Sequence, residues 1–79
     1  DLLFHVQEHD YDLLEIEAIL AKLGLEFVGF PQRQSVIGQY AKKYSGDPAM
    51  TNLRNWHAFE EENPETFREM YALWCRKPL

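Results

Sequence analysis

The sequence has little of what marks several large classes of protein. Its one cysteine, Cys75, cannot form an internal disulfide, which argues against a small secreted domain held by disulfides. Basic residues number 8 against 13 acidic ones, a net charge of -5, whereas a nucleic-acid-binding chain carries a basic surface. No run approaches the roughly 18 apolar residues of a membrane span. We therefore expect no nucleic acid or membrane partner, and a cytoplasmic location.

The sequence also lacks the glycine-rich turns that bind nucleotides and phosphates. Its four glycines are isolated, and they fit neither the dinucleotide fingerprint nor the phosphate-binding loop. No glycine-flanked serine indicates a nucleophile elbow. We therefore predict no catalytic, cofactor-binding or metal-binding residue in this chain.

What is present fits one small domain that spans residues 1–79. The chain has a mass of 9.4 kDa and is 46% hydrophobic and 14% aromatic, a composition typical of a soluble globular protein. The aromatic content is large for so small a core, and part of it is expected to face a partner or the rest of a larger domain. The chain begins at Asp1 rather than Met, which indicates a processed product or a fragment.

The clearest predicted element is a helix over residues 12–23. Asp12 can cap the first turn while Glu15, three residues on, reaches back to it. Gly24 stands where a left-handed residue ends a helix, and Leu25 can make the accompanying apolar contact. The apolar residues of the predicted core face recur at helical spacing: Leu13, Ile16, Leu20 and Leu23.

The remaining elements are less sharply defined. Residues 1–11 favour an extended segment, although a helix remains open. Residues 25–30 predict a short strand that stops at Pro31. Two further helices are predicted over 35–44 and 51–62. Three acids close the second of them and oppose its macrodipole, so a contact from elsewhere must hold that end.

The tail over residues 65–77 can be a helix, or a short helix followed by a strand. Asn63 and Pro64 form a strong helix-start signal. A strand would align Tyr71 with Cys75 on one face, and periodicity alone does not decide. The fold class is therefore α+β and helix-rich, with three to four helices and a short antiparallel strand pair, about 25–30 with 71–77.

One string matches a metal-site pattern. His5, Glu8 and His9 follow the H-x-x-E-H order of the inverted zincins, in which two histidines one helical turn apart bind zinc. Three fixed residues often occur by chance, and the chemistry needs a third ligand, so an ordinary polar face is the better interpretation. The candidates for that ligand are His57, Asp47 and the acids of 60–65.

Three other groups of residues have both a functional and a structural interpretation. Cys75, next to Arg76 and Lys77, can be a thiolate, but a buried structural cysteine is the better interpretation. Four bases can form an anion-binding patch or a solvated surface, the second being favoured: Arg33, Lys42, Lys43 and Arg54. Four aromatic residues can bind a ligand or form core, the second being favoured: Trp56, Phe59, Phe67 and Trp74.

The order of these segments resembles the C-terminal part of class I S-adenosylmethionine-dependent methyltransferases. The closest likeness is to a bacterial group in which the enzyme is often joined to tetratricopeptide repeats. The likeness covers almost the whole chain. The segments that carry it are DLLFHVQEH (1–9), ILAKLGL (19–25), FVGF (27–30), WHAFE (56–60), and NPETF (63–67) through Met70 and Tyr71 to Trp74.

The resemblance implies a place for each element. Residues 12–23 correspond to the last helix of the methyltransferase sheet, 25–30 to its penultimate strand and 71–77 to its final antiparallel strand, and the two helices between are an insertion. In that family the cofactor binds at turns upstream of everything present here. S-adenosylmethionine is therefore implied for the parent enzyme, and this chain alone is expected neither to bind it nor to transfer a methyl group.

The resemblance also leaves apolar surface without a partner, because the central strands of such a sheet are absent. That surface must pair with the rest of the parent domain, within the chain, or between copies, so we expect a homodimer. The alternative function is a small helical module that binds a protein through exposed Trp56, Phe67 and Trp74.

Overall fold

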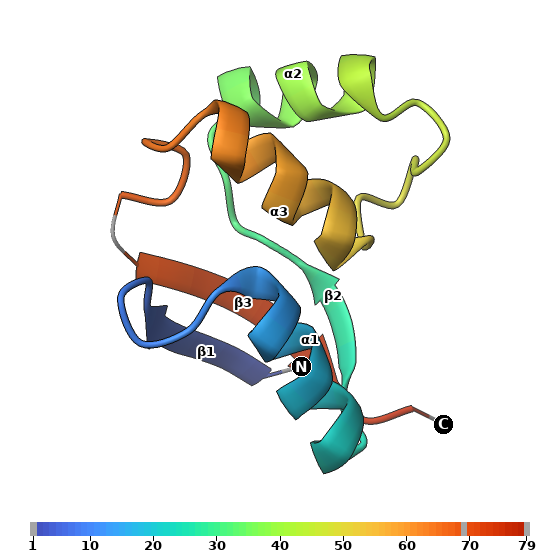
Figure 1. Cartoon of the computed structure of the whole chain (residues 1–79). Coiled ribbons are helices and arrows are strands. Elements are labelled where there is room, and N and C mark those ends of the chain that lie inside the picture. The colour runs from blue at the N-terminus through green and yellow to red at the C-terminus, as the bar shows by residue number, and fades with distance from the viewer. Residues whose placement is uncertain (1, 69, 79) are drawn as a thin grey trace.

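The computed structural model describes residues 2–68 and 70–78. Within them the chain forms three helices and three strands, the α+β class expected from the sequence (Figure 1). In chain order the elements are β1 (Leu2–Gln7), α1 (Leu13–Leu23), β2 (Glu26–Gly29), α2 (Gln34–Lys43), α3 (Leu53–Glu62) and β3 (Met70–Arg76).

The last strand lies in the middle of the sheet. The order is β1-β3-β2, and β3 runs antiparallel to both neighbours, pairing Leu73 with Phe4 and Cys75 with Phe27. The outer strands β1 and β2 are therefore parallel to each other. The predicted pairing of about 25–30 with 71–77 is confirmed, and the extended interpretation of the first segment is confirmed over β1, which adds a third strand to the predicted pair.

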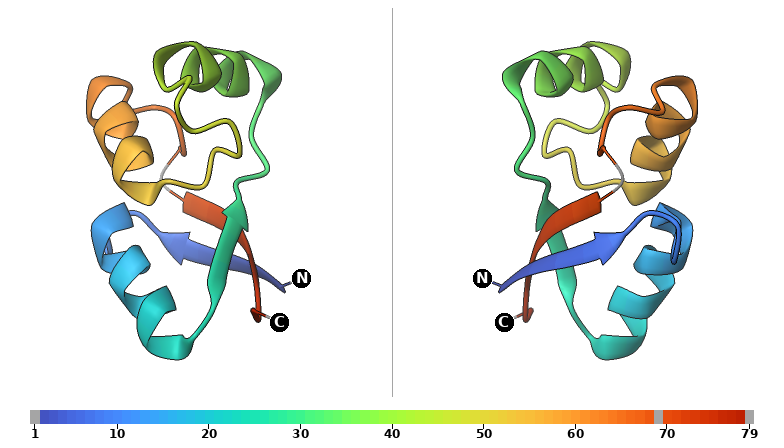
Figure 2. Two further views of the ribbon diagram at one scale, coloured as in Figure 1. Left: turned by 90° about the vertical axis from the view of Figure 1, so that its right-hand side faces the viewer. Right: turned by 90° about the vertical axis from the view of Figure 1, so that its left-hand side faces the viewer.

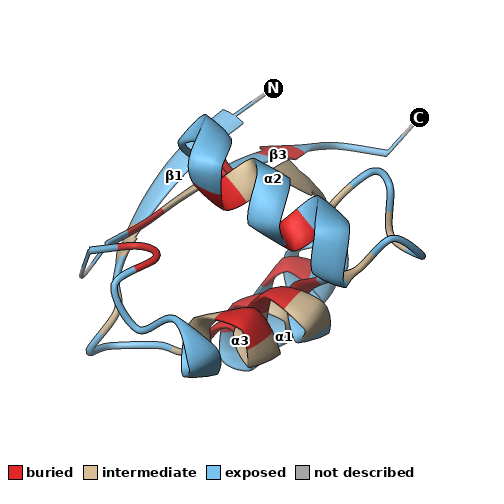
Figure 3. Cartoon of the chain, turned by 90° about the horizontal axis from the view of Figure 1, so that it is seen from above, coloured by how far each residue is buried: buried red, intermediate tan, exposed pale blue. Residues whose placement is uncertain are grey.

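One helix covers a face of this sheet. Helix α1 lies against it, and α3 lies beside α1 but above the strands, next to α2 (Figures 1 and 2). Seen from above, the buried residues of the helices lie on the sides turned inward (Figure 3). The buried apolar residues that form the core are Leu13, Ile16, Leu20, Phe30, Val36, Tyr40, Leu53, Trp56, Phe59, Phe67, Tyr71, Leu73 and Cys75.

Helix α1 has both of the predicted ends. Asp12 accepts a hydrogen bond from the Glu15 amide, and the Glu15 side chain accepts one from the Asp12 amide, at 2.8 and 3.0 Å. Gly24 has a φ of 69°, and its amide donates to carbonyls of the last turn. Glycine reaches this left-handed conformation without the steric penalty of a Cβ atom. The local signals therefore define this helix.

The other helices begin within two residues of the predicted positions. Helix α2 starts at Gln34, and its N-cap residue Arg33 makes no side-chain capping bond. Helix α3 starts at Leu53 because the Asn52 side chain accepts hydrogen bonds from two amides of the first turn, Arg54 and Asn55.

The helix predicted to begin at Asn63 and Pro64 is wrong for the part of the tail that the structure describes, where residues 64–68 form turns. Asn63 ends α3 instead of starting a new helix. Its amide donates to the carbonyls of Phe59 and Glu60, and its side-chain nitrogen donates to the Phe59 carbonyl at 3.0 Å. The tail then enters β3, so the alternative that ends in a strand is correct. Asparagine can stand at either end of a helix, and here its hydrogen bonds lead back into α3.

The two faces of the sheet differ in how far other parts of the chain cover them. Side chains of Tyr71, Leu73 and Cys75 point into the core and are at most 2% exposed. On the opposite face, Leu3 pairs with Trp74, and these side chains are 40% and 37% exposed. Helix α1 lies on the other side of the sheet (Figure 2). The sheet therefore presents an outer face with apolar surface open to solvent.

Candidate functional site

The most perturbed titratable group lies where α3 ends and β3 begins. Tyr71, near the start of β3, donates a hydrogen bond from its hydroxyl to Glu60 Oε1 at 2.7 Å. Glu60 belongs to the last turn of α3, and Glu8 follows the end of β1. Residues from three elements far apart in sequence therefore meet at this corner, which we call the Glu60 corner (Glu8, Glu60 and Tyr71).

Burial dominates the electrostatics of the Glu60 corner. It raises the pKa of Glu60 to about 7, with a further rise from a hydrogen bond with Glu8 and an opposing decrease from the Tyr71 hydroxyl. Burial, followed by the bond to Glu60, also raises the pKa of the Tyr71 hydroxyl. Near neutral pH, Glu60 therefore exchanges a proton easily, which is a property of acid–base residues and also of structural contacts.

The Glu60 corner was not predicted as a site, although one signal pointed to it. The three consecutive acids of 60–62 required a contact to hold an unfavourable helix end. The Tyr71 hydroxyl supplies such a contact to Glu60, and Lys43 forms an ion pair with Glu62. The corner therefore has a clear structural role in fixing α3 against the sheet.

The described residues do not form the arrangement that the zinc interpretation of the H-x-x-E-H string needs. His5 lies in strand β1, and His9 lies in the turn after it, 3.5 Å from a carboxylate oxygen of Asp10. The helix needed to bring the two imidazoles together is not formed there. In residues 2–68 and 70–78 no group of three or more His, Cys, Asp or Glu side chains could hold a metal ion.

Asp47, one of the candidate third ligands, organises a loop. Its carboxylate accepts hydrogen bonds from the Tyr40 hydroxyl at 2.5 Å and from the amides of Thr51 and Asn52 at 3.3 and 3.0 Å. Burial acts to raise the pKa of Asp47, but these hydrogen bonds outweigh it and hold the pKa below its usual value. Asp47 therefore ties the end of α2 to the start of α3.

The four bases of the middle segment form no common patch. Arg33 and Lys42 stand near opposite ends of the ten-residue helix α2. Lys43 pairs with Glu62, and Arg54 Nε lies 3.3 Å from Glu17 Oε1 on α1. The favoured interpretation, a solvated surface, is therefore the correct one for these residues.

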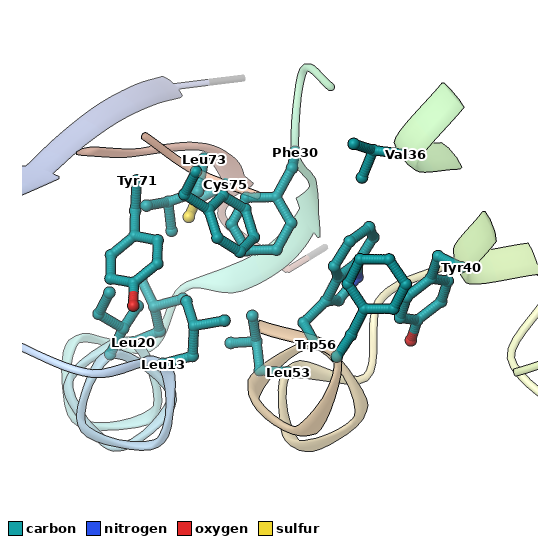
Figure 4. Packing of buried hydrophobic residues seen from close by; sticks show 13 residues of the cluster. Leu13, Leu20, Phe30, Val36, Tyr40, Leu53, Trp56, Tyr71, Leu73 and Cys75 are labelled. Carbon is teal, nitrogen blue, oxygen red and sulfur yellow. The ribbon is translucent and has the colours of Figure 1, made fainter. Parts of the chain in front are cut away.

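Cys75 and most of the aromatic residues belong to the core, as favoured from the sequence. Cys75 is fully buried, and burial raises its pKa, which opposes a thiolate. Trp56 stacks on Tyr40 with ring centroids 3.9 Å apart and meets Phe30 edge-on at 5.2 Å (Figure 4). Trp74 is the exception, because it lies on the outer face of the sheet.

An apolar groove runs between β1 and α1. Its volume is about 240 Å³, and both elements contribute walls from their exposed apolar residues. Sequence reasoning missed it, because residues such as Ile19 and Leu23 continue the apolar face of α1 without a sign that they stay exposed. The groove is lined by Phe4, His5, Val6, Tyr11, Ile16, Ile19, Leu20, Leu23, Leu25 and Leu73.

Searches with this chain found no matching family model, curated protein or solved structure. Within the described residues no helix combines the length and the apolar run that crossing a membrane requires. A function for this chain is therefore inferred from its sequence and from its own geometry.

Proposed function

We propose that this chain is the C-terminal segment of an S-adenosylmethionine-dependent methyltransferase. It supplies the last helix and the last strands of the enzyme's sheet and is not catalytic by itself. The observation that carries the proposal is the pairing of β3 with β2, in which Arg76 faces Glu26 and Cys75 faces Phe27 in antiparallel register. The resemblance requires this relation between the final and the penultimate strand.

The outer face of the sheet also supports the proposal. Leu3 of β1 pairs there with Trp74 of β3, and both side chains are apolar and exposed. Apolar surface on the outer face fits an α/β enzyme, whose sheet is covered on both faces. The exposed Leu3 and Trp74 then belong to a surface that the rest of the parent domain covers.

In this proposal the rest of the parent domain is the partner of the chain, and it binds the cofactor and the methyl acceptor. The Glu60 corner and the Asp47 loop keep structural roles. The helical interaction module is the weaker candidate. It requires a helical tail and exposed Trp56 and Phe67, whereas the tail forms β3 and these two side chains are 1% and 5% exposed.

The proposal is tested by reading the coding frame around this segment and measuring the intact mass of its product. We expect a much longer chain with a glycine-rich turn after a strand upstream of Asp1. Isothermal titration with S-adenosylmethionine should then give micromolar binding for the longer chain and none for the 79-residue chain. A coding frame that encodes little more than this chain, or a longer product that does not bind the cofactor, would refute the proposal.

A further inference from the structure

The two edge strands of the sheet differ in how well they are protected. Within the described residues β1 pairs on one side only, with β3, and its six residues include no charge, proline or glycine. Strand β2 has four residues, carries Glu26 and shifts its register between Phe27 and Gly29. Short length, charge and irregularity are the usual means of blocking an edge. These three features protect the edge of β2, whereas β1 has none of them and its edge stays open.

The open edge continues into the groove between β1 and α1. Phe4 forms one wall and Ile19 and Leu23 the other, with exposed fractions of 37%, 39% and 64%. We call this combined feature the β1 edge surface (the free main chain of β1 with Phe4, Ile19 and Leu23). Its occupant must offer free main-chain donors and acceptors, and uncharged apolar side chains beside them.

We propose that a second copy of the chain occupies the β1 edge surface, with β1 of one copy antiparallel to β1 of the other. Strand β1 meets both requirements itself, since its edge is free and its sequence LLFHVQ carries no charge. An isologous contact across a two-fold axis satisfies both copies at once. The product is one continuous sheet with β1 of each copy at its centre.

The two-fold axis stands perpendicular to the sheet, because this is the symmetry that makes adjacent strands antiparallel. It keeps the helices of both copies on the same face and brings α1 of one copy beside α1 of the other. Leu23 and Ile19 of each copy then cover the groove of the partner. The β1 pairing and the α1 contact therefore close the open surface together.

The area available predicts a weak dimer. The exposed apolar surface at this edge amounts to about 420 Å² per copy if each free side chain presents roughly 180 Å². Two copies then bury about 850 Å², which is below the roughly 1,000 Å² of a stable specific interface and fits a weak contact. We expect a dissociation constant on the order of 10–100 μM. Because each copy has a net charge of -5, added salt should tighten the dimer by screening repulsion. The residues taken to contribute this area are Leu2, Phe4, Tyr11, Ile19 and Leu23.

This inference concerns the 79-residue chain and does not depend on the methyltransferase proposal. A strand supplied by a longer parent chain would compete with the second copy for the same edge. The tests of the two proposals are independent, because one measures the mass of this chain in solution and the other the product of the coding frame.

Sedimentation equilibrium of the 79-residue chain from about 5 μM to about 1 mM tests the proposal. We expect the average mass to rise from 9.4 kDa toward twice that value. Leu23→Lys should raise the dissociation constant at least about tenfold, because it places an ammonium group in each closed groove. The matched control is Leu14→Lys, a 41% exposed position of the same helix that does not line the groove, and its effect should stay below about threefold.

Hydrogen exchange identifies the contact independently. With rising concentration, the β1 amides that point to the open edge should become protected, whereas those of β2 should not change. A mass that stays at 9.4 kDa at every concentration overturns the proposal. So does a dimer that Leu23→Lys and Leu14→Lys weaken equally, or one that leaves the β1 amides unprotected. Circular dichroism of both variants checks that they are folded.

Discussion

The Glu60 corner makes a specific prediction about stability and pH. Burial raises the pKa of Glu60 from 4.5 to about 7, so the folded chain binds this proton more tightly than the unfolded chain. The free energy of unfolding that Glu60 contributes is then greatest below about pH 4.5, falls as the pH rises to about 7, and levels off above it. Replacing Glu60 by glutamine should remove this dependence.

The magnitude follows from the same pKa change. At about 1.36 kcal/mol per pH unit, a fully buried group would give about 3 kcal/mol. Glu60 is only partly buried, and solvent screens its interaction with Glu8, so we expect about 1.5 kcal/mol. The glutamine amide would still accept the Tyr71 hydrogen bond and could donate to Glu8. The Glu60→Gln variant should therefore be more stable than the original chain at about pH 8 by this amount, and equally stable near pH 4.5.

Urea unfolding followed by tryptophan fluorescence, at one protein concentration and at several values of pH between about 4.5 and 8, measures the difference. Trp56 is fully buried and provides the signal. Glu65→Gln, at an exposed position in the following turn, is the matched control and should change stability equally at every pH. Parallel curves for the original chain and Glu60→Gln, or an original chain that gains stability relative to Glu60→Gln as the pH rises, would refute the reasoning.

Three further predictions concern the contacts that fix the helices, each measured by urea unfolding. Tyr40→Phe removes one hydrogen bond to the Asp47 carboxylate and should cost about 1–2 kcal/mol. Asp12→Ala removes the cap of α1 and should cost about 1 kcal/mol, or roughly 4–8 °C in melting temperature. Gly24→Ala should cost about 1 kcal/mol, because φ is 69° there while a Cβ would meet no atom within 4 Å.

Each of these has a control and an outcome that contradicts it. Tyr44→Phe leaves the Asp47 bond intact and should cost less than Tyr40→Phe, and an equal cost would contradict the role given to Asp47. The control for Asp12→Ala is Leu14→Ala, which changes an exposed residue of α1 and leaves the cap in place. It should change stability little. Gly46→Ala stands in open space, and a loss as large as that of Gly24→Ala would show that the left-handed conformation is not the cause.

The sequence alone determined the elements whose signals are local. Helix α1 is the best case, because Asp12, Glu15 and Gly24 act within one turn of the helix ends they define. The short strand before Pro31 and the extended first segment followed from alternation and from the missing amide of proline. The core interpretation of Cys75 followed from its apolar neighbours.

Only the tertiary structure decided the tail and the contacts of distant residues. Periodicity lets the tail over residues 65–77 be a helix or end in a strand. Residues 70–76 form β3 because β1 and β2 offer main-chain partners on both sides while the inward face of the strand is buried. The Glu60 corner and the open edge of β1 depend on positions far apart in the chain. Local propensity acts over a few residues, whereas pairing and burial are set by the fold as a whole.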